Sequence, residues 1–229
     1  MNKKVVVVET KNLIRAVGIA LEYLKRIESK KLQIPGSFLL MIHKPLLANK
    51  PKDAGRYRAA TDQLSIGGAT FTPCESAFVN YRVVDLIDLI NNKRKWKKLY
   101  EDNFLNKIPP KNLESINDRN LDVIKLIFVS WYVHHALTQI HPFTDGNGRI
   151  SRLLMCLILK YGGISNESFP PIINYLINKD KSKYLNCLND ADKNNYITGV
   201  EYMIEILNKS YIETSKMMKV LAKIGNDKK

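Results

Sequence analysis

The side chains best suited to chemistry gather in one short segment, HPFTDGNGRISR at residues 141–152. A histidine, His141, opens this segment, and a carboxylate, Asp145, follows it four positions later. Gly146 and Gly148 let the main chain come close to a ligand, because glycine carries no Cβ. A titratable base, a carboxylate and a glycine loop so close together indicate a catalytic or ligand-binding site.

Two arginines complete the segment. Arg149 and Arg152 are three positions apart and share one face of the helix expected to begin at about Gly148. Cations at a helix N-terminus are unfavourable by ~0.3–1 kcal/mol each, so two of them there suggest a bound anion. The free N–H groups of a helix start bind anions, and arginine pairs with phosphate through two parallel hydrogen bonds. The pattern therefore predicts a polyphosphate site, with Asp145 as the ligand of a Mg²⁺ ion.

Simpler interpretations exist for each residue alone. Asp145 or Asn147 could be a helix N-cap, His141 could be a hydrogen-bonded core histidine, and the arginines could be solvated. We prefer the polyphosphate site because one dozen residues hold all of these groups together. A calcium loop is excluded, because Arg149 stands where that loop needs a further oxygen ligand and then a glycine.

The segment resembles the signature of the Fic family, His-Pro-Phe-x-Asp/Glu-Gly-Asn-Gly-Arg-x-x-Arg, at every specified position. His43, the run Gly55-Arg56-Tyr57-Arg58 and the pair Ile66-Gly67 resemble the family's segment that leads into its flap. Tyr184 and Leu185 resemble the aromatic element that lines its adenine pocket. The resemblance extends over roughly residues 10–210.

The resemblance implies a protein adenylyltransferase that moves AMP from ATP onto a Tyr, Thr or Ser hydroxyl of a target protein and releases pyrophosphate. His141 would be the catalytic base, and Asp145 would bind Mg²⁺. The residues expected to bind the nucleotide are Phe143, Gly146, Asn147, Gly148, Arg149, Arg152 and Tyr184. Among these, Asn147 would hold the α-phosphate, the two arginines would hold the β- and γ-phosphates, and Phe143 would shape the loop.

In the segment from about Asp62 to Thr72, apolar and polar residues alternate instead of following a helical spacing. Two short runs flank the pair Gly67-Gly68, and this predicts a β-hairpin, because such turns need positive φ angles. The resemblance implies a flap on which an extended segment of the target protein adds as a strand. A purely structural hairpin is the alternative.

Other activities of the same pocket stay open. Transfer of UMP or phosphocholine is compatible with the motif, whereas phosphate transfer, as in the Doc branch, goes with a lysine near position 148. Gly148 argues against that branch. A toxin-like or regulatory module that binds nucleotide without transfer is a further alternative, and the intact His141 argues against it.

Many Fic proteins are inhibited by a motif Ser/Thr-x-x-x-Glu-Gly/Asn, whose glutamate pairs with the second arginine, here Arg152. No Ser or Thr precedes a glutamate by four positions in this chain; Val5 stands there before Glu9. The motif would then lie upstream, or on a partner such as an antitoxin, or the chain is unregulated. We expect Arg152 to be free and the chain to be active as it is.

The elements that position the motif are helices. The segment 120–140 is apolar nearly all round, which predicts a central buried helix, and Pro142 disfavours helical geometry at His141. The fold class expected is all-α, a Fic-type bundle with one small β-hairpin flap, in a single domain over 1–229 with its core at 10–210 and a frayed tail at 225–229. Helices are expected at about 11–27, 37–47, 75–91, 120–140 and 148–161, with two or three more after Pro170.

Composition and charge restrict the expected partners and cellular compartment of the protein. The net charge is +14, from 36 basic and 22 acidic residues, but the lysines are scattered, so direct nucleic-acid binding is not expected. No apolar run reaches the length of a membrane span. Three cysteines without a CxxC pair fit a reducing cytoplasm. Residues that we expect to be structural are His43, His134, His135, Trp96 and Trp131.

Overall fold

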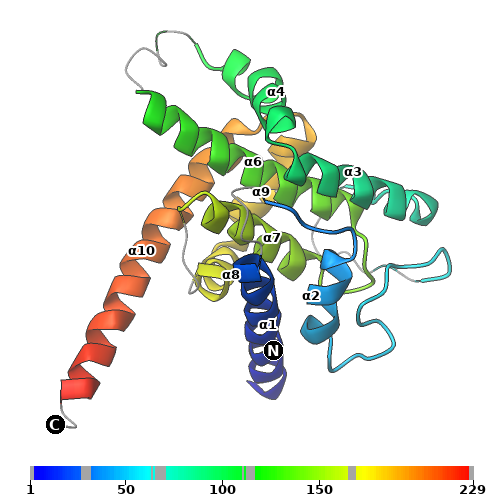
Figure 1. The fold of residues 1–229 in the computed structure, drawn as a ribbon, viewed down its shortest axis with the longest axis vertical. Helices are drawn as coiled ribbons and strands as arrows, with labels where there is room; N and C mark the ends of the chain where they lie inside the picture. Colours follow the sequence, from blue (N-terminus) through cyan, green and yellow to red (C-terminus); the bar gives the residue numbers. More distant parts are fainter. Residues whose placement is uncertain are drawn as a thin grey trace.

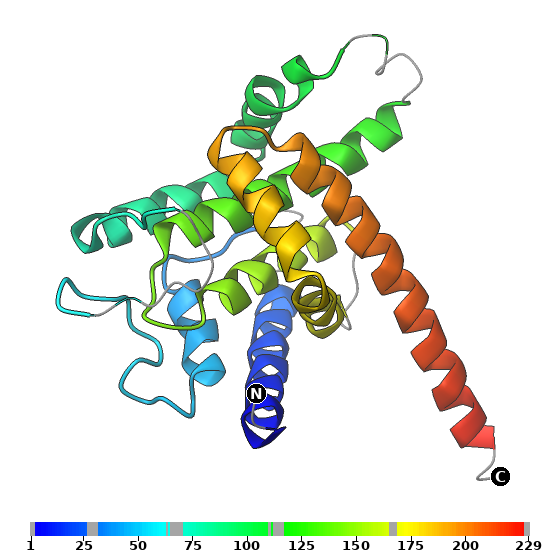
Figure 2. The same ribbon diagram turned by 180° about the vertical axis from the view of Figure 1, so that it is seen from behind.

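The structure is a computed structural model, and it describes residues 3–26, 32–62, 64, 71–109, 111, 117–164 and 169–226. All regular elements in this part of the chain are helical (Figures 1 and 2). The helices are α1 (Lys3–Arg26), α2 (Phe38–Leu46), η1 (Ser76–Phe78), α3 (Val79–Asn91), α4 (Lys93–Asn103), η2 (Leu105–Lys107), α6 (Asp118–Ile140), α7 (Asn147–Tyr161), α8 (Phe169–Lys179), α9 (Lys181–Asp192) and α10 (Ile197–Asn226).

Helix α6 is the centre of the bundle. It packs against α7, α3, α4 and α10, and Figures 1 and 2 show α3 and α4 on one side of it with α9 and α10 on the other. Buried side chains occupy every face of its second half, including Phe128, Trp131 and Leu137. The sequence-based expectation of a central helix is confirmed, and the end of this helix is where the motif begins.

Helix α10 approaches α6 closely because of one glycine. A Cβ on Gly199 would lie 1.9 Å from Nε1 of Trp131, which is far inside van der Waals contact. The C-terminal half of α10 then extends away from the bundle (Figure 1). This helix continues to Asn226, so it includes two residues of the segment that we expected to fray.

Helix α1 lies beside α2, and its further contacts are with α7 and α8. In Figures 1 and 2 it points away from α6. Leu13, Ala16, Val17 and Ala20 form its buried face. This arrangement brings the N-terminal half of α1 near the start of α7, where the motif arginines stand.

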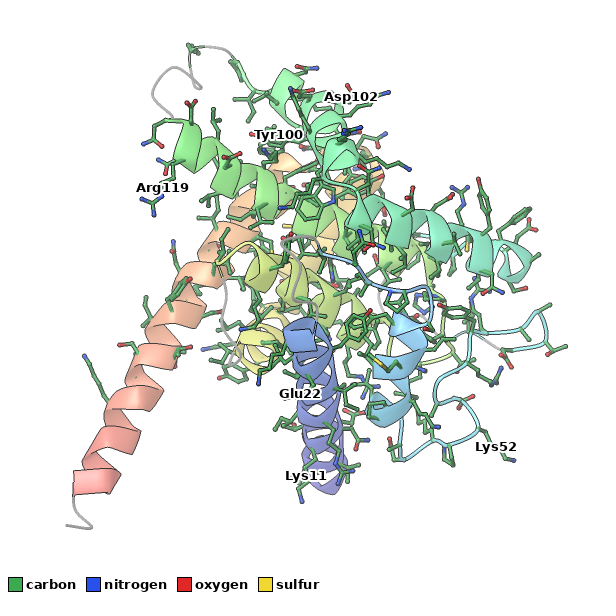
Figure 3. The ribbon with its side chains drawn as sticks, in the orientation of Figure 1. Lys11, Glu22, Lys52, Tyr100, Asp102 and Arg119 are labelled. Carbon is green, nitrogen blue, oxygen red and sulfur yellow. The ribbon has the colours of Figure 1, made fainter. Side chains whose placement is uncertain are left out.

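Several expectations need correction. Helix α4 was not expected, because its sequence has few apolar residues; Asn92 caps it, and Trp96 and Tyr100 are its buried pair. Figure 3 shows Tyr100 on α4 and the exposed Asp102 on a different side of the same helix. The segment expected as one helix from 75 begins with the η1 turn. Ser37 precedes α2 but makes no side-chain cap.

The predicted flap falls mostly on residues 63 and 65–70, which lie outside the described residues. No strand occurs among the residues that the structure describes. No helix among the described residues is long and apolar enough to cross a membrane. All three cysteines are free thiols.

Candidate active site

The motif forms the connection between α6 and α7. Helix α6 ends at Ile140, and His141 takes the left-handed conformation with φ 50° and ψ 57°, which costs a residue other than glycine of order 1–3 kcal/mol. Gly146 is also left-handed, with φ 85°, and immediately precedes the first residue of α7. The two sharp turns place the histidine and the open end of α7 next to one cavity.

His43 of α2 packs against this loop and supports it. The ring of Phe143 is completely buried and stacks on the His43 ring, with centroids 3.7 Å apart. His43 Nε2 donates to the Asp145 carbonyl oxygen at 3.0 Å, and its Nδ1 accepts from the Gly55 N–H at 3.0 Å. Only the neutral imidazole can make both bonds, and burial lowers the pKa of His43 accordingly. The structural role expected for His43 is confirmed.

Asn147 also holds the loop. Its Oδ1 accepts from the Phe143 N–H at 2.9 Å, and its Nδ2 donates to the Phe143 carbonyl at 2.7 Å. Both polar ends of this amide are therefore engaged inside the loop. The contact available to a phosphate is the main chain of Asn147 and Gly148, since the first N–H groups of a helix lack intrahelical partners.

A cavity of about 240 Å³ opens over the loop. Of the residues that the motif predicts, His141, Asp145, Arg152 and Tyr184 line it, together with the turn at Gly146–Gly148; Phe143 and Arg149 do not. Its full lining is Phe71, Thr138, His141, Thr144, Asp145, Gly146, Asn147, Gly148, Arg152, Lys181, Tyr184, Leu185 and Leu188. A larger cavity of about 530 Å³ beside α8 and α10 contains no motif residue.

His141 is neutral and oriented. Burial lowers its pKa, a hydrogen bond from Nδ1 to the Thr138 carbonyl (3.3 Å) partly opposes this, and the nearby Arg58 charge lowers the pKa further. Because Nδ1 carries the proton in that bond, Nε2 holds a free lone pair. A histidine in this state can accept a proton at neutral pH.

Asp145 is surrounded by donors. One carboxylate oxygen, Oδ2, lies 2.6 Å from Nζ of Lys50, and Oδ1 lies 3.1 Å from Nη2 of Arg149 and 2.6 Å from the Gly146 N–H. Burial raises the pKa of Asp145, but these partners, Lys50 first, bring it below its usual value. A single ionised carboxylate fits a Mg²⁺ ion that takes its other ligands from phosphates and water. No group of three or more His, Cys, Asp or Glu side chains that could hold a metal ion occurs among the described residues.

The two arginines diverge. Arg149 turns toward Asp145 and toward α1, where its Nη1 lies 3.5 Å from Oε1 of Glu9. Arg152 lines the cavity, and its Nε donates to Oδ1 of Asn174 on α8 at 2.9 Å. No ion pair between Arg152 and a carboxylate occurs among the described residues. The carboxylate on Arg149 was not expected, because Glu9 lacks the Ser/Thr that the inhibitory motif specifies.

Tyr184 stands behind Arg152. Its hydroxyl is hydrogen-bonded to the Arg152 guanidinium and lies 2.9 Å from Nε2 of His134. His134 is completely buried against Trp131, with ring centroids 5.2 Å apart. The ring of Tyr184 lines the cavity while its hydroxyl joins a buried chain of aromatic and imidazole groups.

Four residues of this site were missed by sequence reasoning, namely Glu9, Lys50, Asn174 and Lys181. Each comes from an element far from the motif in the sequence, and its contact with the site depends on how the helices pack. No local pattern marks them.

Comparisons with known proteins agree with this geometry. The model of the Fic/DOC family matches residues 33–159, which is more than half of the 229-residue chain. Protein adenylyltransferase fic-1 of Caenorhabditis elegans is 31% identical over 136 residues, covering 59% of this chain and 20% of the relative. Protein adenylyltransferase Fic of Drosophila persimilis is 26% identical over 204 residues, covering 89% of this chain and 33% of the relative. The chain thus spans a fifth to a third of the length of these curated relatives.

Solved structures give the same result. A Fic-1 structure from Caenorhabditis elegans has a TM-score of 0.54 and 26% identity, covering 85% of this chain and 48% of that one. A Fic domain containing signaling protein from Bacteroides thetaiotaomicron, at 22% identity and a TM-score of 0.54, shares the fold over 86% of this chain and 68% of that chain. The complete motif, its place between α6 and α7 and these similarities lead to one conclusion: the chain belongs to the Fic/DOC family.

Proposed function

We propose that this chain is a protein adenylyltransferase, which transfers AMP from ATP to a Tyr, Thr or Ser hydroxyl of a target protein. The observation that carries the proposal is the common cavity of His141, Asp145 and Arg152 at the start of α7. A neutral base, a metal-binding carboxylate and an anion site meet there. The names of the curated relatives support the same activity.

In this proposal His141 acts on the acceptor hydroxyl. Its Nε2 takes the hydroxyl proton while the oxygen forms a bond to the α-phosphorus of ATP. The bond from that phosphorus to the bridging oxygen breaks, and pyrophosphate leaves. Alignment of these groups and stabilisation of the developing charge supply the catalysis.

The phosphates lie on the start of α7 in this proposal. The main-chain N–H groups of Asn147 and Gly148 and the guanidinium of Arg152 hold them, and Arg149 joins once it leaves Glu9. Asp145 would hold a Mg²⁺ ion, which neutralises phosphate charge when bound. The ring of Tyr184 borders the space for the adenosine.

The acceptor protein would dock on the flap at about Asp62–Thr72. The same proposal includes an antitoxin or another inhibitory partner, a cytoplasmic setting and a single domain over 1–229. The absence of a lysine at Gly148 supports nucleotide transfer rather than phosphate transfer.

The test is transfer from labelled ATP. The chain is incubated with a lysate and Mg²⁺, once with ATP labelled at the α-phosphorus and once with the label at the γ-phosphorus. AMP transfer predicts protein labelling from the first only. Labelling from the γ-position would indicate phosphate transfer, and no labelling despite bound ATP would indicate a non-catalytic module.

His141→Ala is the matched negative variant. We expect it to lower transfer by ~10²–10⁴-fold, the usual contribution of a general base, with the affinity for ATP nearly unchanged in calorimetry. His135→Ala is the control, because His135 pairs with Asp192 outside this cavity. Full activity of His141→Ala would remove His141 from this role.

A further inference from the structure

A buried arginine lies directly behind the candidate base. Arg58 is 8% exposed, and its Nε donates to the His141 carbonyl at 2.7 Å. Its Nη2 donates to the Ile140 carbonyl at 3.4 Å. A cation on the last carbonyls of a helix also complements the helix dipole. Arg58 therefore closes the end of α6 at the residue that delivers the base.

The same guanidinium reaches a third segment. Nη2 donates to the carbonyl oxygen of Cys74, while the main-chain N–H of Cys74 donates to the Gln139 carbonyl at 3.2 Å. The main-chain N–H of Arg58 donates to the Pro142 carbonyl at 2.9 Å. Arg58 and Cys74 stand immediately before and after the segment 59–73. Both ends of that segment, which includes the proposed flap, are thereby fixed to the catalytic loop.

His141 needs such support, because its main chain is left-handed, a conformation that L-residues disfavour. We propose that Arg58 is a positioning residue that fixes the His141 main chain and joins both ends of the flap segment to the catalytic loop. The inference rests on the proposed role of His141 as the base. It adds a residue outside the motif to the machinery and connects acceptor docking with placement of the base.

Two substitutions separate the geometry of Arg58 from its charge. Arg58→Lys keeps the positive charge but loses the planar fork, and Arg58→Met loses both. Arg119→Met is the matched control, because Arg119 is an exposed arginine at the start of α6, at the opposite end of this helix from His141 (Figure 3).

We expect Arg58→Met to lower the rate of AMP transfer by about 10²-fold, the effect of displacing a reacting group by about 1 Å. Arg58→Lys should lower it by at least about tenfold, because an ammonium does not reproduce the fixed fork. ATP affinity should be unchanged in both, and Arg119→Met should behave as the parent. A parental rate in Arg58→Lys would overturn the proposal.

A second measurement does not need activity. Proton NMR titration follows the His141 imidazole, assigned by its loss in His141→Ala. The other charged groups around this cavity, Asp145, Arg152 and Lys181, are the same in every variant. We expect a higher His141 pKa in Arg58→Met, where a neighbouring cation is lost, and a nearly parental pKa with altered chemical shifts in Arg58→Lys.

The two measurements distinguish the possible failures. If the parent transfers no AMP, the proposed function fails, and the titration still tests the contact between Arg58 and His141. Parental shifts and titration of His141 in Arg58→Met would overturn the inference. If Arg58→Met does not fold, Arg58→Lys tests the inference instead, through its His141 chemical shifts and its rate of AMP transfer.

Discussion

At the scale of single residues, Asp145 makes a close ion pair at the edge of the site. Lys50 places its ammonium 2.6 Å from Oδ2 of this carboxylate, in the region where a Mg²⁺ ion would bind the same oxygen. The ammonium and the metal therefore compete. In the proposed site, the Mg²⁺ concentration that transfer requires would therefore depend on Lys50 as well as on Asp145.

Lys50→Met should lower the Mg²⁺ concentration needed for half-maximal transfer by about 2- to 5-fold, the equivalent of a partly exposed ion pair. Asp145→Ala should raise that concentration, because the carboxylate ligand is lost. Binding of Mn²⁺ in the presence of ATP, followed by electron paramagnetic resonance, should shift in the same directions. Lys52→Met is the control, since Lys52 lies on the adjacent loop and points outward (Figure 3). An unchanged metal dependence in Asp145→Ala would make Asp145 a structural residue.

At the scale of elements, α1 reaches the start of α7 through an ion pair. Glu9 on this helix pairs with Arg149 at 3.5 Å, although the sequence around Glu9 departs from the inhibitory motif that we searched for. The arginine cannot pair fully with Glu9 and with a phosphate. The structure thus places a carboxylate on Arg149, whereas the inhibitory motif would place one on Arg152.

Glu9→Gln should raise the rate of AMP transfer by about 2- to 5-fold, because the pair is partly exposed and such pairs contribute ~0.2–1 kcal/mol. Glu22→Gln on the same helix is the control, because Glu22 (labelled in Figure 3) is exposed and pairs with the exposed Lys25. Rates with saturating and with limiting ATP show whether nucleotide binding changes. A lower rate in Glu9→Gln would show that Glu9 supports Arg149 in a productive position.

Elements also show how far the sequence could predict this molecule. The apolar spacing of α3 and α6 and the breaks at Pro142 and Gly162-Gly163 were sufficient, because strong periodicity and helix-ending residues are local signals. Helix α4 was missed, because two aromatic residues and one cap are a weak pattern. Lys50, Glu9 and Arg58 were not predicted as site residues, because their contacts depend on how distant helices pack. The engagement of Asn147 with Phe143 likewise depends on the shape of the loop.

At the scale of the whole molecule, all four histidines have pKa values below the ordinary 6.5, and burial is the main cause for each. The unfolded chain therefore binds protons at a higher pH than the folded chain does. Stability is complete above about pH 6.5 and decreases as the pH falls toward the folded pKa values. For His134, whose pKa falls to about 3, the loss is about 2 kcal/mol at pH 5.

Urea unfolding at pH 7 and at pH 5 should show a clearly lower midpoint at the lower pH. This window lies above the range in which the carboxylates titrate, so the histidines dominate. His134→Gln should reduce the difference, because the amide oxygen can still accept a hydrogen bond from the Tyr184 hydroxyl and does not titrate. Equal midpoints at the two pH values would contradict the burial of these imidazoles.

The buried chain from Arg152 through Tyr184 and His134 to Trp131 has an optical consequence. Tryptophan emission responds to charges and polar groups close to the indole, and the Trp131 ring centroid lies 6.3 Å from that of Tyr184 and 5.2 Å from that of His134. A nucleotide phosphate that binds Arg152 would change the charge distribution around the Trp131 indole. In a Trp96→Phe background the chain carries a single tryptophan, Trp131, so adding ATP should change the intensity or wavelength of the tryptophan emission, and Arg152→Ala should abolish the change. The molecule would then contain its own reporter of nucleotide arrival, readable without any label.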